Sequence, residues 1–279
     1  MSRYVAVLAL TALVPAFSIR AASPADAAWY TLQKSLNGNQ DHKREALRAL
    51  GAVDPGNEKA VKTLVDALQD KDPQMRAVAA TALGEMKARQ AIGSLRDAIS
   101  DKGEVAFAAA KSLSEMGDSG GRDMFVAMIA GDRTDTPGFV ANGVRDARKR
   151  LKHPQGLILE GMEDAGGALF PPAGYGITAA KEAFKEKGSS SRAVAATYLA
   201  KDPNPYAITL LEWALSDSSW GVRAAAAHGL ALRGNAGSIP KLQLLLEDDR
   251  HAVQTMAAAA ILRITDRLAG TDGVTQAKK

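Results

Sequence analysis

Alanine-rich stretches with the same order of polar and apolar positions recur along the chain at a nearly fixed spacing. Three of them begin 31 residues apart, at positions 192, 223 and 254, and a fourth begins at position 76. They read R-A-V-A-A-T-Y-L (192–199), R-A-A-A-A-H-G-L (223–230), Q-T-M-A-A-A-A-I (254–261) and R-A-V-A-A-T-A-L (76–83). A repeat of this length is typical of solenoids built from stacked helix pairs.

A second set of helices is predicted between these stretches. Their apolar residues follow the spacing i, i+3, i+7, which places them on one helix face; they are Val61, Leu64 and Leu68, then Ile92, Leu95 and Ile99, then Ile208, Leu211 and Leu215, and finally Ile239, Leu242 and Leu246. Aspartates such as Asp72, Asp217 and Asp248 precede the alanine-rich helices, where a carboxylate can cap free N–H groups. We therefore expect an all-α, right-handed solenoid of about five to seven antiparallel helix pairs.

The spacing also divides the chain into segments. We expect repeats over 28–130 and 189–267, a helical insert with a Gly/Pro-rich loop over 131–188, and a disordered polar tail over 268–279. Three interpretations of the loop at 166–177 stay open. It is a packed connector that fills the gap between the two repeat arrays, a binding loop, or a segment that inserts into a membrane surface.

The N-terminal 27 residues have the features of a signal peptide. Arg3 precedes a stretch, Val5–Val14, that is almost entirely apolar and shorter than the ~20 residues needed to cross a bilayer. Ala25-Asp26-Ala27 is a small-residue cleavage site, whereas cleavage after Ala22 would place Arg20 three positions back. We expect export to the periplasm or the medium after removal of 1–27, with no membrane-spanning segment in the mature chain. An uncleaved N-terminal anchor is the alternative.

Composition excludes several classes of protein. The chain has no cysteine, so disulfides, thiol chemistry, cysteine-bound metals and an acylated-cysteine anchor are ruled out. The net charge is +4, and aromatic residues make up 5% of the chain. This mildly basic chain lacks the aromatic residues interleaved with basic ones that stack on bases, so we do not expect nucleic acid as a partner.

The repeated positions resemble HEAT-like repeats, in particular the short kind found in phycobilisome lyases. That pattern combines an Asp-containing turn with an R-x-x-A-A-x-A-L helix, and it is matched by Asp70 or Asp72 with Arg76, by Asp217 with Arg223, and by Arg192. Gln254 and Ala106 depart from it, because they stand where the arginine is expected. The resemblance covers roughly 41–130 and 189–267, and it implies a helix-pair solenoid whose usual role is to bind other proteins.

The arginines that open the alanine-rich helices have two interpretations. They bind anions, or each pairs with the aspartate of a neighbouring turn to form a ladder along the stack. We favour the ladder, because every repeat that has the arginine also offers an aspartate.

The sequence favours a protein that is not an enzyme. It has no phosphate-binding loop, no nucleophile elbow and no H-E-x-x-H motif. The four histidines (His42, His153, His228 and His251) lack a metal-ligating partner three or four residues away. We therefore expect no catalytic residues, no cofactor and no metal. The resemblance leaves one alternative, an accessory or lyase-like enzyme subunit related to bilin lyases.

An aromatic patch is the first candidate binding site. Tyr206, Leu210 and Trp213 align with Gln90, Ser94 and Asp97 of an earlier repeat, at positions off the core stripe. In solenoids of the resembled family, the second helix of each pair lines the concave side, so these residues are expected to form a protein-binding hot spot there. The alternative is that the insert folds over the patch and buries it.

A basic helix face within the insert is the second candidate. Arg145, Arg148, Lys149 and Lys152 follow the spacing i, i+3, i+4, i+7 on one side of a helix that Pro137 begins. These cations either contact an anionic surface, such as lipid headgroups or a polysaccharide, or form a solvated face at the negative end of the helix dipole. The sequence leaves both interpretations open.

Overall fold

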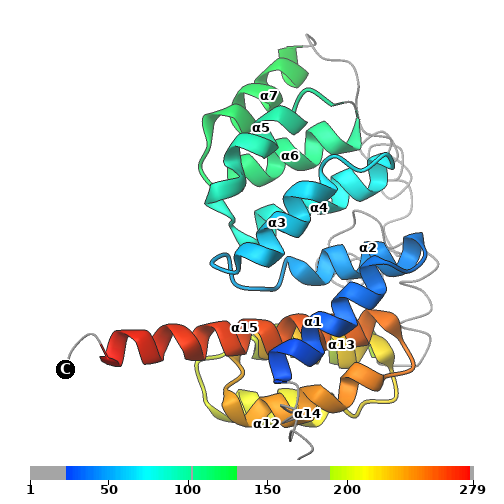
Figure 1. Cartoon of the computed structure of the whole chain (residues 1–279), viewed down its shortest axis with the longest axis vertical. Helices are drawn as coiled ribbons and strands as arrows, with labels where there is room; N and C mark the ends of the chain where they lie inside the picture. Colours follow the sequence, from blue (N-terminus) through cyan, green and yellow to red (C-terminus); the bar gives the residue numbers. More distant parts are fainter. Residues whose placement is uncertain (1–22, 102, 131–188, 277–279) are drawn as a thin grey trace, which may run out of the picture.

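The computed structural model describes residues 23–101, 103–130 and 189–276, and all regular structure within them is helical. Two layers of helices stack along the longest axis (Figure 1). The first layer, which we call A, holds the alanine-rich helices; in spatial order they are α11 (Ser189–Leu199), α13 (Trp220–Arg233), α15 (His251–Gln276), α2 (Gln40–Leu50), α4 (Pro73–Met86) and α6 (Glu104–Glu115).

The second layer, which we call B, holds the helices that link them. In the same spatial order they are α12 (Tyr206–Ala214), α14 (Ile239–Leu244), α1 (Pro24–Leu36), α3 (Glu58–Ala67), α5 (Ile92–Ala98) and α7 (Ser119–Ala130). Short 3-10 turns adjoin two of them: Arg89–Ala91 precedes α5, Ala236–Ser238 precedes α14, and Leu245–Glu247 follows α14. The described residues therefore form six A–B pairs, within the range that the sequence predicts.

Five of the six B helices are each held by one leucine that is fully buried. Leu211, Leu242, Leu32, Leu64 and Leu95 are all 0% exposed, and each comes from the apolar stripe of its helix. In five of the six A helices the last position of the alanine-rich stretch is also fully buried, at Leu230, Ile261, Leu50, Leu83 and Leu113, whereas Leu199 of α11 is partly buried. Burying an aliphatic side chain contributes roughly 1.5–3 kcal/mol. The same register is thus repeated from one end of the stack to the other.

Small residues let neighbouring A helices approach closely. A Cβ atom at Gly84 of α4 would lie only 2.3 Å from the Ser112 hydroxyl of α6, and that hydroxyl donates to the carbonyl of Ala80 (2.9 Å). Larger side chains at these positions would push the helices apart. The high alanine content of the chain therefore follows from the short distance between A helices.

The order of the stack differs from the order of the sequence. The last described helix, α15, packs against α13 on one side and against α1 and α2 on the other. The C-terminal array thus precedes the N-terminal array in space, and α15 and α1 together form one helix pair. The two arrays therefore meet directly, and the interpretations of the loop at 166–177 concern residues outside the described part. Segment 131–188 links α7 and α11, which lie at opposite ends of the stack.

Polar contacts fasten this junction, which we call the seam. The Arg263 guanidinium of α15 donates to the carbonyls of Ala52 (3.0 Å) and Val53 (3.3 Å), which follow α2. Asn57 donates to the Asp266 carboxylate (2.8 Å) across 209 residues of sequence. The fully buried Leu32 belongs to the same contact. The seam is therefore packed and hydrogen-bonded like the other unit boundaries.

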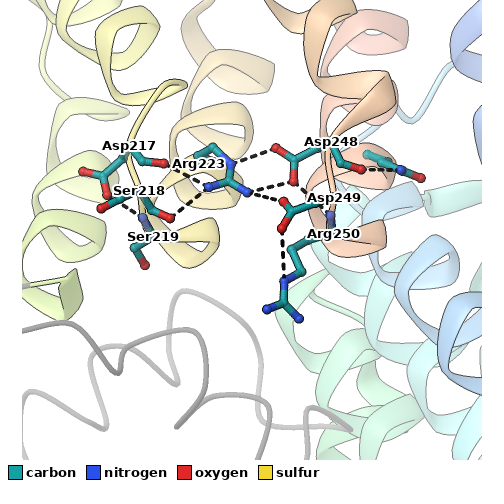
Figure 2. Close-up of polar contacts among 8 residues, drawn as sticks. Asp217, Ser218, Ser219, Arg223, Asp248, Asp249 and Arg250 are labelled. Atoms are coloured by element: carbon teal, nitrogen blue, oxygen red, sulfur yellow. Dashed lines mark hydrogen bonds and ion pairs between the residues drawn. The ribbon is translucent and has the colours of Figure 1, made fainter.

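The predicted arginine–aspartate ladder is confirmed. Arg76 binds Asp101, Arg192 binds Asp217 and Arg223 binds Asp248, always across 25 residues, with the closest N–O distances at 2.6–2.7 Å. In Figure 2 the Arg223 guanidinium lies between two successive turns, because it also donates to the carbonyls of Asp217 (2.9 Å) and Ser218 (3.1 Å). Arg76 and Arg223 therefore each join the turn of their own unit to the turn of the next.

The ladder changes its chemistry where the sequence departs from the pattern. Lys43 of α2 takes the arginine position and pairs with Asp70. At the seam, Gln254 of α15 donates to the carbonyl of Asp248 and makes no ion pair there. The hydrogen bonds from Arg192 lower the pKa of Asp217 from its ordinary value of 3.8, so this carboxylate stays ionised at lower pH than a free aspartate would.

Three features at the ends of helices were not predicted or bear on a prediction. Asn39 caps α2, since its side chain accepts from the His42 N–H (2.9 Å). The residues expected to be a disordered tail are helical as far as Gln276, because no proline ends α15. Ala27, after which cleavage is predicted, lies inside α1, whose first turn is closed by a capping box between Ser23 and Asp26. The cleavage itself stays a prediction, and residues 1–22 lie outside the described part.

The seam can be tested with a cysteine pair, since the chain has no cysteine of its own. We expect Asn57→Cys with Asp266→Cys to cross-link within one molecule through a short thiol-reactive linker, because the two native side chains touch. The readout is a mobility shift of the monomer on a denaturing gel. Asp97→Cys with Asp266→Cys is the control and should not cross-link. Equal reaction of both pairs would contradict the seam.

The ladder can be tested at Arg223, whose side chain and partner Asp248 are both mostly buried. We expect Arg223→Met, which keeps the aliphatic stem, to lower the free energy of unfolding by about 2–4 kcal/mol, because it removes the buried ion pair with Asp248 and the hydrogen bonds to the carbonyls of Asp217 and Ser218. Lys62→Met removes only an exposed pair with Asp66 and should cost under about 0.5 kcal/mol. Urea denaturation of both variants gives the comparison. Equal effects would show that the ladder does not stabilise the stack.

Candidate functional site

The outer side of the B layer carries large apolar side chains that the core does not use. Tyr206 and Trp213 of α12 are 62% and 78% exposed, and Leu244 of α14 is 76% exposed. Leu210, the third residue of the predicted patch, is half-buried between them and the core. The structure thus places Tyr206 and Trp213 on the surface, with Leu210 as their partly covered neighbour.

Sequence reasoning missed Leu244, although the signal was present. Leu244 stands 31 residues after Trp213, so the two occupy the same position in adjacent repeats. Each follows its fully buried leucine, Leu211 or Leu242, by two residues, which turns it toward solvent on the outer side of the helix. The exposed apolar residues therefore form a set that spans two neighbouring helices.

Polar contacts between α12 and α14 hold this surface in place. Glu212 accepts hydrogen bonds from the Ser238 hydroxyl (2.7 Å) and from Lys241, both at the α14 end of the contact. Burial alone would raise the pKa of Glu212, but these hydrogen bonds lower it, so the carboxylate is ionised near neutral pH. In addition, the Asn204 side chain accepts from the Tyr206 N–H (2.9 Å) and fixes the start of α12. The apolar side chains thus stand on a rigid support.

The second predicted site cannot be placed. Arg145, Arg148, Lys149 and Lys152 lie outside the described residues, so the basic face of the insert stays a prediction, as does the loop at 166–177.

Within the described ranges, no group of three or more histidine or carboxylate side chains could hold a metal ion. His228 is partly buried on the A layer, where burial and the nearby Arg263 lower its pKa. A polar depression beside the ladder is lined by Asp70, Arg76, Asp97 and Asp101 among others. Two of its three aspartates are already in ion pairs, Asp101 with Arg76 and Asp70 with Lys43.

A pair of histidines marks the seam. The rings of His42 at the start of α2 and His251 at the start of α15 lie 3.7 Å apart between centroids, tilted by 47°. The His251 Nδ1 atom is 3.1 Å from the Gln254 side-chain oxygen. Burial and the charge of His251 lower the pKa of His42, and Asp41 only partly offsets them. Protonation of His42 is thus disfavoured when the seam is closed.

None of the helices within the described residues combines the length and the apolar character needed to cross a bilayer.

Comparison with known proteins identifies the family. The model of the HEAT repeats matches residues 31–114, 72–136 and 180–263, which is more than half of the chain. The chain therefore belongs to the HEAT-repeat family, as the repeated positions predict. The narrower likeness to the phycobilisome-lyase repeats stays a prediction.

Two further comparisons add little to this assignment. Among solved structures, human deoxyhypusine hydroxylase in complex with glycerol is 16% identical, with 87% of this chain and 97% of that chain covered and a TM-score of 0.32. A likeness at this level carries no functional conclusion. None of the curated proteins matches the chain.

The histidine pair gives the seam a predictable pH dependence. Because the pKa of His42 in the folded chain is below its ordinary value of 6.5, folding stability is fully present above pH 6.5 and decreases as the pH falls through it. Burial raises the pKa values of Glu45 and Glu85 to about 7, so their protonation has the opposite effect in the same range. Thermal unfolding of wild type and His42→Gln should therefore be compared between pH 7.5 and 5, and the wild type should lose more stability than the variant as the pH falls. The ladder carboxylates Asp217 and Asp248 stay ionised over this range, since their pKa values are lowered from 3.8. An unchanged pH profile in His42→Gln would contradict this account.

Proposed function

We propose that this HEAT-repeat chain is a non-catalytic scaffold that binds another protein through the concave face of its solenoid, which the outer sides of the B helices are expected to form, centred on Tyr206, Leu210 and Trp213. The observation that carries the proposal is the exposure of two aromatic side chains, at 62% and 78%, on a helix whose core position is already filled by Leu211. Tyrosine and tryptophan are the residues that most often dominate binding energy at protein interfaces.

The surface chemistry supports protein binding better than catalysis. Apolar and aromatic side chains bind mainly by desolvation and shape complementarity, and of the three residues only Tyr206 carries a group that can transfer a proton. The described residues near Trp213 include one carboxylate, Glu212, and it is occupied by Ser238 and Lys241. An accessory or lyase-like enzyme role therefore has less support. Binding to anionic surfaces depends on Arg145, Arg148, Lys149 and Lys152, which lie outside the described residues.

We place this binding outside the cytoplasm, in the periplasm or the medium. The support for export is the sequence of residues 1–27, with Arg3, the apolar stretch Val5–Val14 and the small-residue site at Ala25–Ala27. The absence of cysteine is compatible with an oxidising compartment but does not require one.

Capture experiments on extracts of the source cells test the proposed surface. Wild-type protein should retain at least one partner, and Tyr206→Ala with Trp213→Ala should weaken that capture by roughly 30-fold, as expected for hot spots worth about 2 kcal/mol. Tyr198→Ala is the matched control, because Tyr198 is an equally exposed aromatic residue (74%) on the A helix α11. Full retention of every partner by the folded double variant would overturn the proposal.

A further inference from the structure

We propose that the docking surface continues across the seam onto α1, and that its occupant is a protein segment whose apolar side chains lead into acidic ones. This inference rests on the proposed function and names the partner chemistry of the same face. Its basis is the arrangement of exposed residues on five adjacent B helices, α12, α14, α1, α3 and α5, in the order in which they stack.

The repeat register defines which residues share this face. Relative to the buried leucine of each B helix, the residues five before, two before and two after it point outward. On three adjacent helices these positions are almost free of charge. They hold Tyr206, Thr209 and Trp213 on α12, then Gly237 just before α14 with Pro240 and Leu244 on it, and then Ala27, Tyr30 and Lys34 on α1. Tyr30 is 70% exposed. We call these nine positions the uncharged strip, because eight of them carry no charge and the ninth, Lys34, lies at its end.

The same positions change character on the next helix. On α3 they hold Lys59, Lys62 and Asp66, where Lys62 pairs with Asp66 at 2.7 Å. Lys59 lies over the Trp29 ring of α1, with its Nζ atom 4.2 Å from the ring centroid. Within the residues that the structure describes, neither Lys34 nor Lys59 makes an ion pair. The strip therefore ends at α1 against two cations whose charge is available.

This charge pattern selects the occupant. A segment lying along the strip meets apolar side chains on α12 and α14 and then the ammonium groups of Lys34 and Lys59, which attract carboxylates. A second copy of this chain carries no carboxylate on its own strip, so pairing two strips about a two-fold axis would leave Lys34 and Lys59 without a carboxylate partner. Phosphate-rich polymers would place their charges on the uncharged strip. A protein segment with an apolar part and an acidic end fits both halves.

The length of the strip sets the size of the segment. Adjacent helices lie roughly 8–10 Å apart, so three of them span about 20 Å. A helix covers that distance in roughly 15 residues, at about 1.5 Å per residue. The partner is thus a short amphipathic segment, and its binding requires α1 to lie beside α14, which only the closed seam provides.

Selection from a peptide library tests this inference with the full chain as target. The probe is a random 16-residue library displayed on phage, with the bound peptides sequenced, resynthesised with a fluorescent label and their affinities measured by fluorescence anisotropy. Enriched peptides should carry several large apolar residues and a cluster of Asp or Glu at one end. Tyr30→Ala and Leu244→Ala should each weaken their binding about tenfold, and Lys34→Glu with Lys59→Glu should switch the selected end from acidic to basic. Tyr198→Ala is again the matched control, and far-UV circular dichroism checks that each variant is folded.

The outcomes separate this inference from the proposed function. If Trp213→Ala abolishes binding but Tyr30→Ala, Leu244→Ala and the charge reversal do not, the surface is confined to α12 and the composite strip is wrong. If binding is indifferent to Trp213→Ala as well, the proposed function fails too. A library that yields no enriched peptide overturns the strip, whereas capture of a partner through Trp213 would still support the scaffold role.

Discussion

The packing of α15 against α1 and α2 is the contact on which the rest of the structure depends. It buries Leu32 and Ile261 completely and adds the hydrogen bonds of Arg263 and Asp266 across more than 200 residues of sequence. Without it the chain would hold two short arrays, each with one apolar face of a helix uncovered. With it, both layers continue through six pairs in one register. Long-range contacts of this kind form late in folding, because the intervening chain must first be closed into a loop.

The helices and their buried faces could be predicted from sequence because the spacing of apolar residues within each repeat determines both. Leu83, Leu230 and Ile261 recur in one position and are all fully buried. The order of the stack could not be predicted, since every A helix offers nearly the same alanine-rich surface to any other. One signal was available. Among the described residues, the first helix, α1, carries a B-type stripe (Trp29, Leu32, Leu36) and the last helix, α15, carries an A-type stretch, so the two can complete one pair.

The candidate site shows the same division between local and long-range information. Tyr206 and Trp213 could be assigned to the surface because alignment with an earlier repeat places them off the core stripe. Tyr30 could not be added to them, because its helix lies beside α14 only when the seam is closed. The ladder behaves likewise: Arg223 and Asp248 follow from the spacing, whereas the histidines and Gln254 at the seam gain their meaning from the spatial order.

The seam also changes how stability is distributed along the solenoid. In a linear array each unit contacts only its neighbours, so the first and last units can fray without loss of the middle. Here the first and last described helices form the central pair, and the units at the two ends of the stack come from the interior of the chain. Loosening of α1 or α15 therefore uncovers apolar surface on α2, α13 and α14 at once. Because the uncharged strip crosses this pair, a ligand that contacts both α14 and α1 binds only the closed form, and by linkage it must stabilise the closure that creates its site.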